Sequence, residues 1–456
     1  MNFLQKRKKT SERWNCFSKA DVLGSFDFMT LTISLDSLNI NDFNYLESLL
    51  SRSDYRDGIL NRDLEYGLYE ALKKLYGLSL HEYTHFVDST STAWGASFLL
   101  SLNEAYLTNH DIFGTEESEY HKAKCFFDLV KSFKLPDYYT AKTPDADPST
   151  PWSHQVTSGK RFNNNGELSD VPITFISFWN SNQERIVRSP LSMIAILEIS
   201  AMAQEILYKS FLVNALPENA RIVESSQLQE ESLNFIFNHE LTEYSACAHL
   251  VANIHGFTNI IMAYTVCERI ATVVLNFTDK CFDDISFSDL ARKTLHIDTN
   301  KSLETVCKNS IKSRDRGYVF YLICLLMPER NYENDEEIRK GISASLEAMG
   351  LNYHQVIMFA RREVEVASQT LSNSPIKCIA ELSGSLLKNF DNKLEAKLGM
   401  YDFSSFDLPP ALLGDCETVT TNKGVDNALK KYDIEGAYDE LVKGQLWVER
   451  FSEACV

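Results

Sequence analysis

Residues 81–85 read His-Glu-Tyr-Thr-His, and this spacing constrains the chain more than any other feature. In an α-helix, residues four apart lie on one face, about 6 Å apart along the axis. His81 and His85 can therefore direct two imidazoles at one metal ion. Glu82 is turned about 100° from His81 around the same helix, so it can reach a metal-bound water without being a ligand. The sequence therefore predicts a metal centre on a helix.

The expected ion is Zn²⁺, because two neutral imidazoles suit it and a position left open to water makes such a site catalytic rather than structural. Zinc lowers the pKa of its water, and we expect Glu82 to accept the proton as this water attacks a carbonyl. Asp88, three residues after His85, lies on a similar face. We expect its carboxylate to accept the second ring N–H of a ligating histidine.

The surrounding residues favour a helix through this motif. Leu68, Leu72, Leu75 and Leu78 recur at helical spacing before it. We predict that the helix starts near Asp63, which can cap it, and ends at about residue 88.

A second, apolar helix is expected to supply the third ligand. Ser189 and Pro190 are typical of a helix start, with serine as the N-cap and proline in the first turn. Between residues 191 and 203, Glu198 is the only ionisable residue. A helix that is apolar all round is normally buried, and a buried carboxylate is costly unless it is paired or coordinates a metal. Glu198 is therefore the first candidate for the third ligand.

Glu243 is the alternative third ligand, on a helix expected over residues 235–250. The same region offers polar groups that could stabilise a developing oxyanion. These groups are His239, Tyr244, His249 and His255.

Strand patterns occur in two places. Residues 26–35 alternate in part and are rich in β-forming residues, which predicts a strand. Residues 155–187 contain three β-rich segments with Asn-Gly turn chemistry, which predicts a β meander. The chain from residue 338 onward is expected to be mostly helical, and we find no catalytic motif in it.

The charge balance excludes several partners. The chain has 63 acidic and 45 basic residues and a net charge of −18. We therefore expect no nucleic-acid partner, since such proteins present basic surfaces, and no binding to an anionic membrane. Ten cysteines without a Cys-x-x-Cys pair, no secretory segment and no apolar run of membrane-spanning length predict a cytoplasmic protein with reduced thiols.

At residues 81–85 the chain resembles the zincin metallopeptidases. Metzincins carry a glycine and a third histidine after the second histidine, and Asp88 and Ser91 stand there instead. The pattern is more similar to the gluzincins, whose third ligand is a glutamate on a later helix. Residues 81–86 and 89–95 also resemble a loosely defined group of uncharacterised bacterial proteins, in which a helix of the form x-Glu-x-x-Ala follows, as in residues 197–201.

The resemblance implies that His81, His85 and Glu198 bind zinc and that Glu82 is the general base. It also implies an α+β, predominantly helical fold with a zincin-like core and a small twisted sheet. We expect residues 1–330 to form the catalytic domain, with the meander at about 153–188 as an insertion, and residues 331–456 to form a helical C-terminal region.

The predicted function is hydrolysis of peptide bonds in a protein or peptide by a zinc metallopeptidase. The alternative is a catalytically silent zincin-fold protein that binds or regulates through a protein partner, and the long C-terminal region motivates it. The same ligand set would also serve hydrolysis of a different amide, because fold analogy does not decide chemistry.

Overall fold

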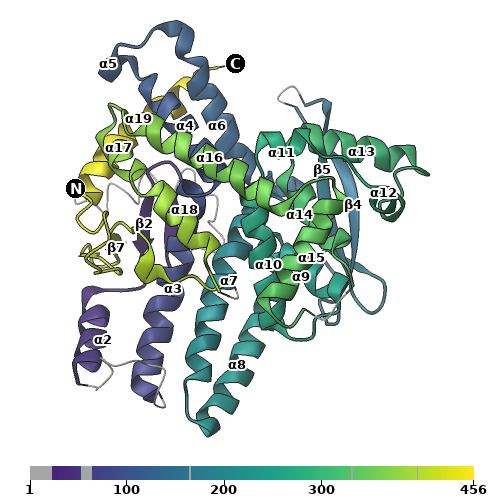
Figure 1. Ribbon diagram of the computed structural model, residues 1–456, viewed down its shortest axis with the longest axis horizontal. Helices are drawn as coiled ribbons and strands as arrows, with labels where there is room; N and C mark the ends of the chain where they lie inside the picture. Colours follow the sequence, from purple (N-terminus) through teal and green to yellow (C-terminus); the bar gives the residue numbers. More distant parts are fainter. Residues whose placement is uncertain (1–22, 53–63, 164–165, 330–331, 398, 456) are drawn as a thin grey trace.

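The computed structural model describes residues 23–52, 64–163, 166–329, 332–397 and 399–455 (Figure 1). The fold is α+β and predominantly helical, which confirms the predicted class. The helices are α2 (Ile40–Arg52), α3 (Tyr66–Thr90), α4 (Ala93–Leu107), α5 (His110–Phe113), α6 (His121–Phe133), α7 (Met193–Asn214), α8 (Glu218–Ile236), α9 (Thr242–His255), α10 (Ile260–Leu275), α11 (Asp279–Asp283), α12 (Asp289–Thr294), α13 (Lys301–Lys312), α14 (Arg316–Leu326), α15 (Asp335–Ala348), α16 (Tyr353–Leu371), α17 (Lys377–Ser383), α18 (Leu386–Leu394) and α19 (Ile434–Ala454).

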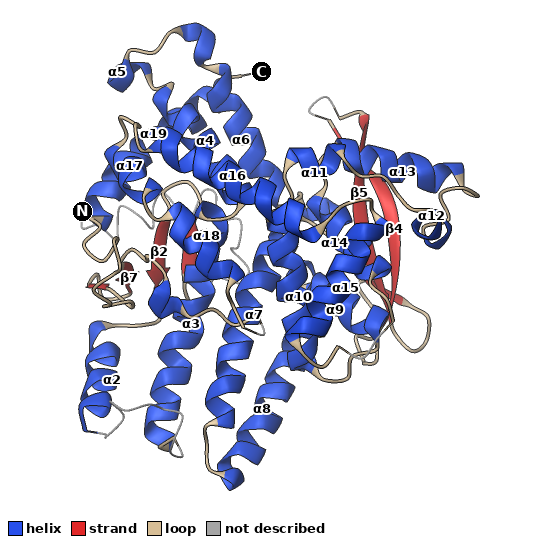
Figure 2. Cartoon of the chain, in the orientation of Figure 1, coloured by secondary structure: helices blue, strands red, loops and turns tan. Residues whose placement is uncertain are grey.

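Two small sheets accompany the helices, and Figure 2 shows them on the left and right of the helical body. The first sheet has the strand order β1 (Ser25–Asp27), β2 (Thr32–Leu35), β7 (Ala411–Leu413) and β8 (Thr418–Val419). The second has the order β3 (Ala141–Lys142), β6 (Arg185–Pro190), β5 (Leu168–Trp179) and β4 (Ser153–Phe162). The first sheet packs against α3 through β1 and β2.

The expected strand over residues 26–35 is instead a hairpin of β1 and β2. Its two strands pair antiparallel, and Leu31 in the turn adopts a positive φ of 52°. The carboxylate of Asp27 accepts hydrogen bonds from the backbone N–H groups of Met29 and Thr30 and so stabilises the turn. Local side-chain bonding therefore overrides the β propensity of residues 28–31.

The predicted meander is present as β4, β5 and β6, which pair antiparallel in that order. The expected helix start at Ser189 and Pro190 is wrong. Both residues belong to β6, and the N–H of Leu191 donates to the carbonyl of Thr174 at 2.8 Å. Pairing with β5 keeps the chain extended there, and α7 begins at Met193 with Ser192 as its N-cap.

Helix α3 carries the His-Glu-Tyr-Thr-His segment and runs through the core. Every residue from Ser79 to Thr90 is buried, because helices and the first sheet surround this part of α3. The hydroxyl of Tyr83 donates to the carbonyl of Pro409 at 2.7 Å, which links α3 to the chain just before β7. The expected cap, Asp63, lies outside the described residues, and α3 begins at Tyr66 after Glu65.

Residues of the C-terminal region take part in the same core. Strand β7 pairs in parallel with β2, and one hydrophobic cluster extends from Phe26 to Val448. The expected domain boundary at residues 330 and 331 lies outside the described residues, and the division of the chain into two domains stays a prediction.

A buried chain of polar groups joins the C-terminal region to α3. The ammonium group of Lys393 on α18 donates to the carboxylate of Asp88 and to the hydroxyl of Tyr401, and all three side chains are buried. Tyr401 in turn donates to Glu268 on α10 at 2.8 Å. Asp88 was expected to hold a ligating imidazole, but its observed partner is a lysine 305 residues further along the chain. Sequence spacing does not reveal such a distant partner.

None of the helices in the described ranges is, by itself, both long and apolar enough to cross a membrane. Helices α9 and α10 reach the length and hydrophobicity of a membrane span only when they are taken together, and the chain bends by 110° between them. The nine cysteines among the described residues are all free thiols.

The Asp88–Lys393 pair yields a stability prediction. Lys393→Met leaves the carboxylate of Asp88 buried without its cation, so the free energy of unfolding should fall by about 3–5 kcal/mol. Urea denaturation of the metal-free protein measures this loss. Adding Asp88→Asn should restore part of it, because no unpaired charge then remains buried.

The control for this experiment is Lys308→Met on α13. Lys308 pairs with Glu304 at 2.7 Å, but its side chain is 72% exposed, so its removal should change stability little. Equal losses for both variants would contradict a special role for the buried pair.

Candidate metal centre

Helices α3 and α7 lie side by side and bring the three predicted ligands together (Figure 1). Within the described ranges, His81, His85 and Glu198 are the group of metal-binding side chains whose ligand atoms all lie within 4.8 Å of one another. The Nε2 atoms of the two histidines are 3.2 Å apart. Each lies 3.7 Å from an oxygen of Glu198.

The side chain of Glu198 fits a metal ligand. It is completely buried, and neither carboxylate oxygen has a hydrogen-bond partner among the described residues. Burial raises the pKa of Glu198 to about 7; the nearby His81 opposes this shift, and the charges of Glu205 and Glu243 add to it. A carboxylate in this environment is compensated when a cation binds beside it.

The spacing of the two imidazoles also fits one ion. Two nitrogens bound at about 2.0–2.1 Å to a tetrahedral zinc ion lie about 3.3 Å apart, close to the 3.2 Å between the Nε2 atoms of His81 and His85. Two imidazole nitrogens and one carboxylate are ligands that zinc commonly takes in catalytic sites. These residues therefore suit Zn²⁺ with a position left for water.

Glu243, the alternative third ligand, is buried near this cluster but does not converge on the imidazoles. One of its oxygens accepts a hydrogen bond from the hydroxyl of Ser192 at 3.2 Å. Glu243 lies in the first turn of α9, whereas Glu198 lies on α7, the helix packed directly against α3. The geometry thus favours Glu198.

Glu205 is a site residue that the sequence analysis missed. Its carboxylate lies 3.4 Å from Nδ1 of His81 and 2.5 Å from the ammonium group of Lys209. Residues seven apart lie on one face of a helix, so the placement of Glu198 toward α3 implies the same direction for Glu205. A carboxylate behind a ligating imidazole fixes the orientation and tautomer of the ring.

The ionisation of these groups shows that the site attracts positive charge. Burial alone would lower the pKa of His81, but Glu205, Glu198 and Glu82 together outweigh burial and raise it to about 10. Burial and the neighbouring charge of His81 lower the pKa of His85 well below its usual value. The carboxylates around His81 therefore favour positive charge in this cluster, and a metal ion bound there would require both imidazoles to be neutral.

Glu82, the predicted general base, is 2% exposed and faces a cleft that also contains His81 and Glu198. The cleft has a volume of about 720 Å³. Gly24 packs against Glu82, and a Cβ atom at this glycine would lie 3.0 Å from Oε1 of Glu82 and 2.9 Å from the carbonyl oxygen of Ser34. Any larger residue would push on the carboxylate, a constraint that the sequence alone does not reveal.

The polar groups suggested as oxyanion donors do not line this cleft in the described part of the chain. His249 is a buried core residue whose Nε2 lies 2.9 Å from the carbonyl of Ile236, and its ring stacks on Trp152. Burial lowers the pKa of His249 and of His255 to about 4. His239 contacts Glu240, and Tyr244 is buried on α9.

Comparisons with protein-family models, with curated proteins and with solved structures find no match to this chain. The interpretation of the site therefore rests on its geometry and chemistry.

The two candidate ligands can be separated by metal affinity. Glu198→Gln should weaken zinc binding by about 100-fold or more, because loss of a direct ligand should exceed the 10–100-fold cost of losing an outer partner. Glu243→Gln should bind zinc like the wild type. Competition with a chromogenic chelator measures both affinities, and the reverse ranking would assign the ligand to Glu243.

Glu205 gives a further prediction. Glu205→Met keeps the length of the side chain but removes the carboxylate that lies 3.4 Å from Nδ1 of His81, so zinc affinity should fall by about 10–100-fold. The matched control is Glu231→Met on α8, an exposed glutamate outside the metal cluster and the cleft. Unchanged affinity in Glu205→Met would show that Glu205 does not support the histidine.

Proposed function

We propose that the protein is a zinc-dependent metallopeptidase with a zincin-like core. The observation that carries this proposal is the convergence of His81, His85 and Glu198 at a cleft that Glu82 also lines. The packing of the β1–β2–β7–β8 sheet on α3 supports the zincin-like arrangement. The gluzincin pattern, with a glutamate ligand on a later helix, is the closest description of this set.

Zinc bound to these three residues would act as a Lewis acid that acidifies a water and polarises a substrate carbonyl. His81 and His85 would hold the ion through Nε2, and the carboxylate of Glu205, 3.4 Å from Nδ1 of His81, would orient the first ring. The carboxylate of Glu82 accepts a proton from the attacking water and returns it to the departing amine. The low exposure of Glu82 keeps bulk water from competing for that proton.

The cleft is consistent with a peptide substrate. Apolar side chains line its walls, including those of Leu78, Met202, Phe235 and Leu241. Lys74 and Lys209 also line it, but each already pairs with an acid, Asp42 at 2.7 Å and Glu205 at 2.5 Å. The cleft thus offers apolar contacts beside the metal cluster, as a site for peptide side chains requires.

The proposal predicts that Glu82→Gln retains zinc but loses turnover. Removing a general base should lower kcat by about 100- to 10,000-fold, because the amide cannot accept the proton. Cleavage of a diverse peptide library, followed by mass spectrometry, measures activity, and metal analysis of the same sample measures zinc.

The matched control is Glu70→Gln, since Glu70 lines the same cleft on the same helix but lies three turns away from Glu82. It should retain activity. Cleavage by the Glu82→Gln variant at the rate of the wild type would contradict the role of Glu82 as general base. Zinc-loaded wild-type protein that cleaves no member of the library would favour the catalytically silent binding protein.

A further inference from the structure

A second cavity lies apart from the metal cleft and shares no lining residue with it. Its volume is about 270 Å³, close to the lower end of the range of about 300–1,000 Å³ for ligand pockets. Parts of α6, β5, α7 and α14 enclose it. One wall is apolar and includes Trp94, Phe133 and Ile173, while three arginines and one aspartate form the charged part.

The charged groups in this cavity are unevenly paired. Arg314 forms ion pairs with Asp279 at 3.2 Å and Asp283 at 2.7 Å. Asp315 caps α14, and its carboxylate accepts a hydrogen bond from the N–H of Tyr318 at 3.0 Å. These two residues are therefore already engaged by the protein itself.

Arg161 and Arg316 have no carboxylate within 4.0 Å in the part of the chain that the structure describes. The Nη2 atom of Arg316 donates to the carbonyl of Phe277 at 2.9 Å, but its buried Nε has no acceptor among the described residues. Burial lowers the pKa of Arg316 to about 10, although the charges of Asp279 and Glu363 oppose this shift. A guanidinium in such surroundings lacks its usual counter-ion.

The unpaired state of Arg161 and Arg316 among the described residues contrasts with the acidic composition of the chain. The protein has 18 more negative than positive charges, so acids to pair with arginines are plentiful. Arg161 and Arg316 nevertheless line one cavity without a carboxylate within 4.0 Å among the residues that the structure describes. Ser132 and Ser192 also line the cavity, but their hydroxyls already donate to the carbonyl of Leu129 at 2.6 Å and to the carboxylate of Glu243 at 3.2 Å.

We propose that this cavity binds a small organic anion with an apolar body. The carboxylate or phosphate group pairs with Arg316 and Arg161, since a guanidinium matches both groups with two parallel hydrogen bonds. The apolar body lies against Trp94 and Phe133. This proposal does not depend on the proposed peptidase activity, because it concerns different residues.

The test uses 4-phenylbutyrate, phenyl phosphate and the neutral 4-phenylbutanol as probes in isothermal titration calorimetry with the full-length protein. At least one anion should bind with a 1:1 stoichiometry, and the stronger of the two identifies the preferred head group. The alcohol should bind about tenfold or more weakly, because it lacks the charge that the arginines recognise.

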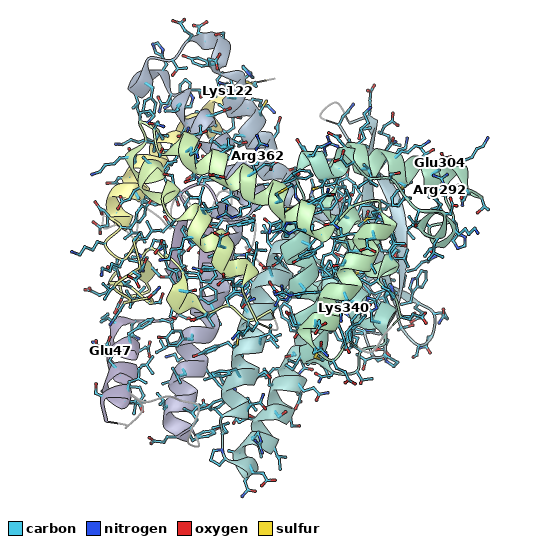
Figure 3. All side chains as sticks on the ribbon, viewed as in Figure 1. Glu47, Lys122, Arg292, Glu304, Lys340 and Arg362 are labelled. Carbon is cyan, nitrogen blue, oxygen red and sulfur yellow. The ribbon has the colours of Figure 1, made fainter. Side chains whose placement is uncertain are left out.

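Arg316→Gln and Arg161→Gln should each weaken binding of the preferred anion by about tenfold or more, for the same reason. The control is Arg362→Gln, an exposed arginine of α16 that does not line the cavity (Figure 3). It should bind the anion like the wild type. Two separate cavity variants keep the test informative if one of them fails to fold.

Several outcomes would overturn the anion site. These are no binding of either anion at millimolar concentration, equal binding of the alcohol, and unchanged anion binding in both arginine variants. The Glu82→Gln protein separates this result from the metal centre, since it should bind the anion like the wild type.

Discussion

The buried carboxylate of Glu198 is the constraint on which the centre of this structure depends. It projects from an apolar helix into the core, where neither oxygen has a hydrogen-bond partner among the described residues. Burial makes this charge costly unless a neighbouring group or ion compensates it or the carboxylate is protonated. The two imidazoles of α3 face it at 3.7 Å, and a cation shared by all three groups would resolve the imbalance.

The rest of the core holds the two ligand-bearing helices in place. Asp88, one turn beyond the second histidine, pairs with Lys393 of α18. Gln204, on α7, donates to the carbonyl of Gly399 at 2.6 Å and accepts from the N–H of Tyr401 at 2.9 Å. Lys393, Gly399 and Tyr401 therefore join this part of the chain to both helices through buried hydrogen bonds. Such fixed surroundings would hold the candidate ligands in position for a metal ion.

The convergence of the three candidate metal ligands was predictable from the sequence because each residue was identified by a local rule. The spacing of His81 and His85 follows from helix geometry, and Glu198 is the only ionisable residue in an apolar helical segment. Glu205 could have been predicted in the same way, since it lies seven residues after Glu198 and therefore on the same face of the helix.

Features that depend on distant contacts were not predictable. The partner of Asp88 is 305 residues away, and the close approach of Gly24 to Glu82 exists only once the first sheet packs on α3. Local interactions explain the two places where the secondary structure differs from the prediction. An aspartate turn divides the expected first strand into a hairpin, and strand pairing holds Ser189 in an extended conformation where a helix cap was expected.

The account is tested most directly by a crystal structure of the zinc-soaked protein with data collected above and below the zinc absorption edge. We expect one strong anomalous peak within about 2.0–2.2 Å of Nε2 of His81, Nε2 of His85 and a carboxylate oxygen of Glu198. An anomalous peak on other residues, or none at full zinc loading, would contradict the central claim.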